Sequence, residues 1–134
     1  MIFIVNPISG NGRKKRLVSS LKKAGYNVVY TEYAGHGEVL ARATSAKVVV
    51  AVGGDGTVHD VLNGIAEYVY SSVDPDVAIS DFTLGVLPVG SGNDWVKSTG
   101  VPRDIKGAVD VIAAGCTGLQ DVVRVEVLDP SDYA

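Results

Sequence analysis

The sequence predicts a three-layer α/β domain with a mainly parallel sheet, and three observations support this fold class. Short apolar runs rich in valine and isoleucine alternate with longer segments of helical period, which is the pattern of repeated βα units. A glycine-rich stretch follows each apolar run. The chain has 134 residues, enough for one domain with one core.

The apolar runs give four expected strands, and the periodic segments between and after them give five expected helices. The strands cover residues 2–5 (IFIV), 27–31 (NVVYT), 47–52 (KVVVAV) and 83–88 (TLGVLP). The helices cover residues 12–24, 37–44, 57–70, 91–99 and 104–114. Pro88 stops the last strand. Thr57 with Asp60, and Ser91 with Asp94, have the spacing of helix-capping pairs and are interpreted as caps of the third and fourth helices.

Composition and charge limit the classes of partner. The chain carries 15 acidic and 12 basic residues, a net charge of -3, which argues against duplex nucleic acid as a partner. No apolar run has the length needed to cross a bilayer, and Met1 leads directly into the first strand, so a cytoplasmic location is expected. The single cysteine, Cys116, fits a reducing compartment and is interpreted as an apolar filler at a helix end.

Four glycine clusters stand where the strands end: SGNG, AGHG, GGDG and VGSGND. The carboxyl ends of parallel strands share one edge of a sheet, and ligands bind in the crevice outside that edge. Glycine also serves tight turns without any ligand. Each cluster here carries a free hydroxyl, amide, imidazole or carboxylate as well, so we expect all four loops to line one ligand cleft.

The third cluster is typical of a phosphate site. Gly53, Gly54 and Gly56 leave backbone N–H groups unobstructed at a helix start, where the helix dipole favours an anion. Asp55 by itself would repel a phosphate. It therefore requires a bridging cation or serves to accept a proton from a substrate hydroxyl. Thr57 can cap the helix and still donate to a phosphate oxygen. Zinc is not expected, because the chain has only two histidines and no cysteine pair.

Three further groups of residues leave alternatives open. Asn93 either orients a substrate hydroxyl or fixes a neighbouring loop. The basic residues 13–16 lie in a first helical turn, where the helix dipole disfavours cations. They face nucleotide phosphates, an anionic membrane surface or solvent. Residues 31–37, with Thr31 and His36, form an adenine or ribose pocket or a simple turn.

Three stretches, NPISG, GGDGTVHDVLNG and LPVGSGNDW, resemble in order and separation the catalytic domain of diacylglycerol kinases and of the related sphingosine and ceramide kinases. GGDGT alone also occurs in NAD kinases and phosphofructokinases, whereas GSGND points to the lipid kinases. The resemblance implies a Rossmann-like fold of the NAD kinase and diacylglycerol kinase type. It also implies ATP-dependent phosphorylation of a lipid hydroxyl with Mg²⁺, on a lipid at a membrane surface, and it leaves peripheral membrane attachment and a homodimer open.

The resemblance also implies roles for individual residues. Asp55 is the implied catalytic residue, as a base or through Mg²⁺. Asn93 and Asp94 are the implied substrate-binding residues. The implied nucleotide contacts are Asn6, Pro7, Ser9, Gly10, Thr31, Gly53, Gly54, Asp55, Gly56, Thr57, Asp60 and Ser91. His59 and Asp60 stand where bacterial relatives usually have Asn and Glu, which leaves the choice of lipid open.

Members of this family continue into a second, β-rich domain. We therefore interpret residues 1–120 as the nucleotide-binding domain and residues 121–134 as the start of a strand that crosses into that domain. The chain alone is then expected to bind ATP or ADP with little or no lipid kinase activity. The alternatives are a noncatalytic module that binds nucleotide or a partner, and an NAD kinase-like enzyme, whose downstream glycine-rich signature is not visible here.

Overall fold

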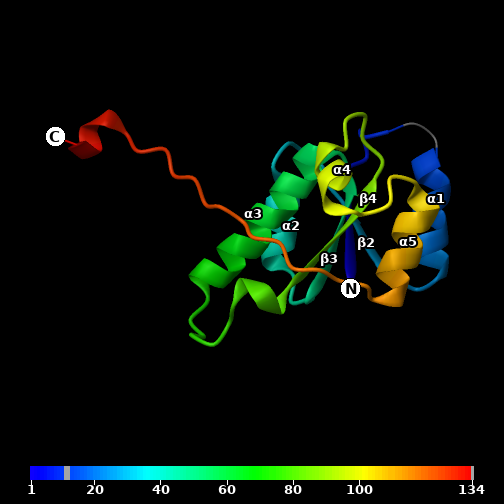
Figure 1. Ribbon diagram of the computed structural model, residues 1–134, viewed down its shortest axis with the longest axis horizontal. Helices are drawn as coiled ribbons and strands as arrows, with labels where there is room; N and C mark the ends of the chain where they lie inside the picture. Colours follow the sequence, from blue (N-terminus) through cyan, green and yellow to red (C-terminus); the bar gives the residue numbers. More distant parts are fainter. Residues whose placement is uncertain (11–12, 134) are drawn as a thin grey trace.

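The computed structural model describes residues 1–10 and 13–133 as a parallel β-sheet with helices on both faces (Figure 1). The elements are β1 (Ile2–Val5), α1 (Arg13–Lys23), β2 (Asn27–Tyr30), α2 (His36–Ala43), β3 (Val48–Gly53), α3 (Asp55–Ser71), the 3₁₀ turn η1 (Ile79–Asp81), β4 (Thr83–Pro88), α4 (Asp94–Thr99), α5 (Ile105–Ala114) and the 3₁₀ turn η2 (Pro130–Tyr133). The strand order is β2-β1-β3-β4 and every pair is parallel. The expected fold class is confirmed.

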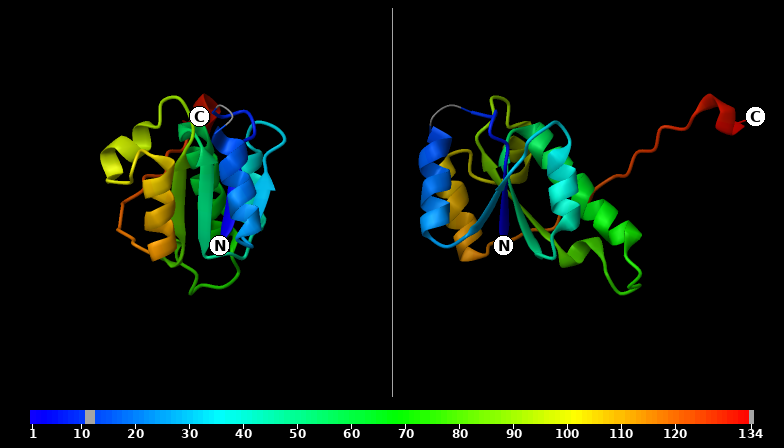
Figure 2. Two further views of the ribbon diagram at one scale, coloured as in Figure 1. Left: turned by 90° about the vertical axis from the view of Figure 1, so that its right-hand side faces the viewer. Right: turned by 180° about the vertical axis from the view of Figure 1, so that it is seen from behind.

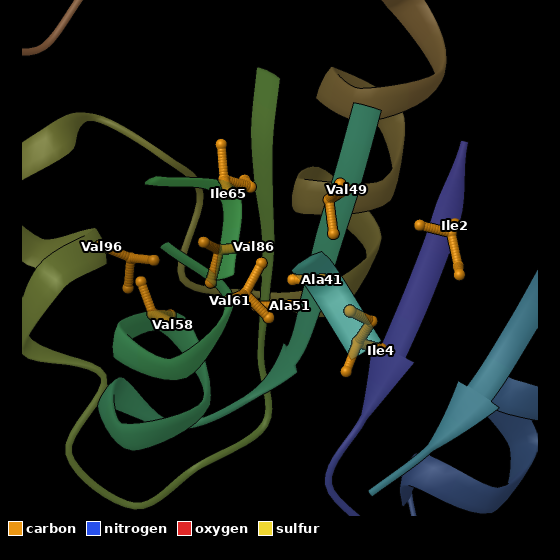
Figure 3. Close-up of a cluster of buried hydrophobic side chains, with 10 residues drawn as sticks. All are labelled: Ile2, Ile4, Ala41, Val49, Ala51, Val58, Val61, Ile65, Val86 and Val96. Carbon is orange, nitrogen blue, oxygen red and sulfur yellow. The ribbon is translucent and has the colours of Figure 1, made fainter. Parts of the chain in front are cut away.

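The side chains of the strands alternate between two cores, which explains why each strand is a continuous apolar run rather than an alternating one. Figure 3 shows the core between the sheet and α2 and α3, which includes Ile4, Ala51 and Val86. The opposite core lies under α1 and α5 and includes Phe3 and Leu87. Figure 2 shows these two helix layers on either side of the sheet.

The register brings the ends of three strands to one edge of the sheet. Val5 pairs with Val52 between β1 and β3, and Gly53 pairs with Pro88 between β3 and β4. The loops that follow β1, β3 and β4 therefore begin side by side. β2 lies outside β1, at the far edge of the sheet.

The helix α2 packs closely on α3 at Gly64. A Cβ atom added to Gly64 would lie 2.3 Å from the carbonyl oxygen of Glu38 and 2.6 Å from Cβ of Ala41. Only glycine therefore allows this approach of the two helices. The exposed, partly apolar segment that follows α5 runs away from the sheet (Figure 1).

Residues 121–129 lie outside any helix or strand. The expectation that residues 121–134 begin a strand that crosses into a second domain stays a prediction. Two other expectations about the elements differ from the structure. α4 begins at Asp94 instead of residue 91, because residues 90–93 form a turn. Cys116 is exposed beyond the end of α5, so its interpretation as a filler is wrong.

Candidate functional site

An open cleft with a volume of about 1120 Å³ lies at the carboxyl edge of the sheet. Its walls are the loops that follow β1, β3 and β4, the first turn of α3 and the turn before α5. The lining residues are Ile8, Ser9, Gly10, Lys14, Gly54, Asp55, Gly56, Pro88, Val89, Gly90, Ser91, Gly92, Arg103, Asp104 and Ile105. Three of the four glycine clusters thus meet at one cleft, which confirms the expected convergence for these three.

Glycine allows these three loops to touch. A Cβ atom on Gly90 would lie 2.4 Å from the Cα atom of Gly54, and one on Gly10 would lie 2.3 Å from the carbonyl oxygen of Val89. Gly10 also has a φ of 73°, in the left-handed region. The backbones of the three loops are therefore in contact at the floor of the cleft, and peptide groups make up much of its surface.

Asp55 is the first residue of α3, and its carboxylate reaches across to the start of α4. Oδ2 accepts a hydrogen bond from the backbone N–H of Asp94 at 2.9 Å, and Oδ1 accepts one from the backbone N–H of Trp95 at 3.0 Å. The hydrogen bonds from Trp95 and Asp94 hold the pKa of the Asp55 carboxyl below its ordinary value. Asp55 therefore ties the third glycine loop to the fourth and caps α4 from outside that helix.

Both capping interpretations made from the sequence are wrong. The N-cap of α3 is Gly54 and the N-cap of α4 is Asn93, and neither makes a side-chain cap hydrogen bond. Thr57 is buried inside α3 against Gly53, and Asp60 packs against Gly37 of α2. The sequence places the true cap of α4, Asp55, 39 residues from Asp94, so a local pattern does not reveal it.

The side-chain hydrogen bonds of Asn93 lie within its own loop, and its role toward a substrate stays a prediction. Its backbone is left-handed, with a φ of 53°. Its Oδ1 accepts from the N–H of Gly90 at 3.1 Å, and its Nδ2 donates to the carbonyl oxygen of Gly90 at 2.7 Å. Asn93 thus fixes the turn of its own loop. The neighbouring Asp94 side chain pairs with Lys97 at 2.6 Å on the surface.

Lys14, one of the basic residues 13–16, lines the cleft. Its side chain is buried, and its Nζ donates to the carbonyl oxygen of Asn6 at 2.7 Å and to that of Ser9. Burial lowers the pKa of the Lys14 ammonium. Asn6 adds a second tie, since its Oδ1 accepts from the N–H of Ile8 at 3.0 Å. A lysine in the first turn of the helix after a glycine loop is the signal in the sequence.

The second glycine cluster, AGHG, does not line the cleft, which corrects the expectation that all four loops converge there. Thr31 is buried and its N–H donates to the carbonyl oxygen of Val5 at 2.9 Å. His36 stacks on Tyr33 with ring centroids 4.4 Å apart. The physical reason is strand order, because β2 lies at the sheet edge beyond β1 whereas the cleft lies over β1, β3 and β4. Arg103, Asp104 and Ile105 line the cleft instead, and they were not predicted from the sequence.

Asp55 offers a single carboxylate to a cation. Within residues 1–10 and 13–133 no group of three or more His, Cys, Asp or Glu side chains could hold a metal ion. Each Asp55 oxygen accepts one backbone hydrogen bond and retains a further lone pair. Mg²⁺ usually takes one or two carboxylates together with substrate phosphates and water. Asp55 thus fits the protein's share of such a site.

The fold and the cleft together define a class of protein: a parallel α/β domain with a glycine-lined ligand site at the carboxyl edge of its sheet. Residues 1–125 match the family model described as "Diacylglycerol kinase catalytic domain", and the chain belongs to this family. No helix in the described ranges is long and apolar enough to cross a membrane.

Curated relatives and solved structures agree with this family. The chain is 37% identical over 132 residues to a diacylglycerol kinase of Staphylococcus aureus (strain MRSA252), covering 92% of this chain and 39% of the relative. It is 38% identical over 132 residues to a diacylglycerol kinase of Staphylococcus epidermidis (strain ATCC 12228 / FDA PCI 1200), with the same coverage of 92% and 39%. A crystal structure of a diacylglycerol kinase from Bacillus anthracis (strain Sterne) superposes with a TM-score of 0.66 at 26% identity, covering 85% of this chain and 41% of the other. The chain thus spans about 40% of the length of these relatives.

Proposed function

We propose that this chain is the nucleotide-binding part of a lipid kinase, which transfers a phosphoryl group from ATP to the hydroxyl of a lipid such as diacylglycerol. The observation that carries the proposal is the meeting of three glycine loops at the first turn of α3, beside Lys14. The first N–H groups of a helix lack partners within it and favour phosphate. The family supports ATP as the nucleotide.

The cleft suggests which residues touch the nucleotide and which hold the cleft in shape. Ser9, Gly10, Gly54, Gly56 and Ser91 line the cleft and are the proposed contacts to the phosphates and sugar. The remaining sequence-derived residues are proposed to support these loops from behind or beside them. They are Asn6, Pro7, Thr31, Gly53, Thr57, Asp60, Asn93 and Asp94.

Asp55 is proposed to act through position and charge rather than as a general base. A general base works best when its pKa lies near the working pH, whereas hydrogen bonds lower the pKa of Asp55. Asp55 is the residue of this chain that would hold Mg²⁺, which would supply charge neutralisation on the phosphates. The carboxylate also keeps the β3 and β4 loops in one arrangement through α4.

The lipid-binding part and any general base are proposed to come from the remainder of a full-length relative. The chain spans 39% of the curated relatives, so we propose that by itself it binds nucleotide and phosphorylates little or no lipid. We place the reaction on the cytoplasmic side, at a membrane surface where the lipid resides.

A homodimer is also part of the proposal. Light scattering on the purified chain would measure whether it forms.

Calorimetric titration of the chain with ATP and ADP in the presence of Mg²⁺ tests the nucleotide site. We expect Asp55→Asn to weaken binding by at least about tenfold, because a charge-assisted contact is lost. Asp74→Asn is the matched control. It removes the same charge from an exposed turn, where the side chain also accepts a backbone hydrogen bond, and should leave affinity unchanged. The absence of nucleotide binding by the unaltered chain would contradict the proposal.

A further inference from the structure

Arg103 is a charged side chain of the cleft that the protein itself leaves unengaged. The other charged side chains of the described cleft lining each bind backbone groups. Lys14 donates to carbonyl oxygens of the loop after β1, and Asp55 accepts from N–H groups at the start of α4. Asp104 caps α5, because its Oδ2 accepts from the N–H of Gly107 at 2.7 Å. Arg103 is exposed, and within the described ranges no ion pair or side-chain hydrogen bond engages its guanidinium.

The turn that carries Arg103 is fixed to the domain on both sides of this residue. Before it, Val101 packs against the buried residues of both cores, and the ring of Pro102 restricts the backbone. After it, the turn packs on the first turn of α5. A Cβ atom added to Gly107 would lie 2.9 Å from Cβ of Pro102 and 2.9 Å from Oδ1 of Asp104. The backbone of Arg103 is therefore held at the cleft, and its long side chain alone is free to reach a ligand.

The charges of the cleft balance only when Arg103 is included. Among the described lining residues, the carboxylates of Asp55 and Asp104 face the cations Lys14 and Arg103. Without Arg103, an anion that enters the cleft would meet both carboxylates and a single lysine, whose ammonium already binds two carbonyl oxygens. The guanidinium of Arg103 offsets this repulsion. Its planar set of N–H donors also fits two phosphate oxygens at once.

Arg103 and the first turn of α3 approach the cleft from different sides. α5, which follows Arg103, covers the same face of the sheet as α1, whereas α3 covers the other face (Figure 2). Gly54 and Gly56, at the start of α3, line the same cleft as Arg103. An extended anion that lies across the ends of the strands can therefore contact backbone N–H groups at α3 and the guanidinium on the side of α5.

We propose that Arg103 binds the phosphate chain of the nucleotide, on the side of the cleft opposite to α3. Arg103 thereby makes the cleft select a nucleoside diphosphate or triphosphate over an uncharged nucleoside. This inference rests on the proposed function and adds to it a phosphate-binding residue outside the glycine loops.

A guanidinium can also stack on the base of a nucleotide, because it is planar and delocalised. The charge balance of the cleft favours the phosphate contact, since stacking on a base would leave the repulsion by the two carboxylates unopposed. The two contacts differ in what they recognise. Inorganic tripolyphosphate has the phosphate chain without the base, so it separates them.

Calorimetric titration of the purified chain with ATP and with inorganic tripolyphosphate, both with Mg²⁺, tests the proposal. We expect Arg103→Gln to weaken the binding of both ligands by the same factor, about fivefold, because an exposed charge-assisted contact is lost. Arg103→Lys keeps the charge and should lose only about twofold. The matched control is Arg42→Gln, which removes the same charge from an exposed position on α2 away from the cleft. It should change either affinity by less than about twofold.

The salt dependence of binding and the stability of the variant complete the test. The affinity of Arg103→Gln for ATP should fall less steeply with added salt than that of the unaltered chain, because one charge contact fewer is screened. The midpoint of urea unfolding should be unchanged, which separates loss of a ligand contact from loss of the fold. Equal ATP affinities of Arg103→Gln and the unaltered chain, or a loss with ATP that tripolyphosphate does not share, would overturn the proposal.

The same titrations distinguish this inference from the proposed function. ATP binding by the unaltered chain that does not depend on Arg103 removes the Arg103 contact alone and leaves the nucleotide site standing. Binding of tripolyphosphate that depends on Arg103, without any binding of ATP, leaves a phosphate contact at Arg103 and removes the kinase.

Discussion

Two charged side chains hold the cleft together by binding backbone groups rather than each other. Lys14 binds two carbonyl oxygens of the loop after β1, and Asp55 binds two N–H groups at the start of α4. In both cases a single side chain forms hydrogen bonds with peptide groups of a loop or a helix end that would otherwise lack a partner. The cleft is therefore shaped before any ligand binds. Such preorganisation is what phosphoryl transfer requires, since its catalysis rests on positioning and charge.

The Asp55 tie predicts a pH-dependent contribution to stability. The folded-state pKa of Asp55 lies below its unfolded value, so its contribution is fully present above the unfolded value of about 4 and is lost as pH falls through the folded pKa. At neutral pH we expect the unaltered chain to have a higher free energy of unfolding than the Asp55→Asn variant. This difference should shrink progressively as the pH falls towards about pH 2. Urea unfolding of both proteins across this range is the measurement. A difference that stays constant from neutral to acid pH would contradict the hydrogen-bonded carboxylate.

At the scale of elements, α2 and α3 form the closest helix pair, and their contact depends on one missing side chain. Gly64→Ala would place a methyl group against the backbone of α2, so we expect a loss of about 1–3 kcal/mol in the free energy of unfolding. Gly56→Ala lies on the same helix with no heavy atom within 4 Å, and it should be neutral or stabilising by up to about 1 kcal/mol. Urea denaturation measures both. Equal effects of the two substitutions would refute the close contact at Gly64.

The same scale shows what could be predicted from the sequence. The strands were found closely, for example β4 at residues 83–88, because parallel strands buried on both faces read as short valine-rich runs ended by glycine or proline. Helix starts were found less well. Thr57 and Asp60 have a capping spacing, yet α3 begins at Asp55 and packs both side chains elsewhere. Local patterns compete with tertiary packing at such ends, and packing prevails here.

The part of the site that lies directly at the carboxyl edge of the sheet could be predicted from the sequence. Glycine clusters after β1, β3 and β4 identified most of the cleft, because strand ends in a parallel sheet converge. The cluster after β2 was misjudged, since strand order is a tertiary property that spacing does not encode. The cap provided by Asp55 and the contribution of Arg103 depend on contacts between distant parts of the chain, so no local signal marked them.

At the scale of the whole molecule, one sheet separates two chemically different sides. The side that carries α1 is cationic on its surface, and the side that carries α2 and α3 holds a core that depends on Gly64. The cleft opens at the sheet edge between these layers. The cleft therefore draws on both helix layers, with the first turn of α3 on one side and Lys14 of α1 on the other.

The segment beyond α5 contributes little to this arrangement, which gives a prediction for the molecule as a whole. Val123, Val125 and Val127 are more than 80% exposed, and the guanidinium of Arg124 lies 4.7 Å from the centroid of the Tyr70 ring. We expect deletion of residues 118–134 to change the free energy of unfolding by less than about 0.5 kcal/mol. The affinity for ATP, measured by calorimetric titration, should also be unchanged, because the cleft does not include this segment. A loss of more than about 1 kcal/mol would mean that the exposed valines pack on the domain in solution.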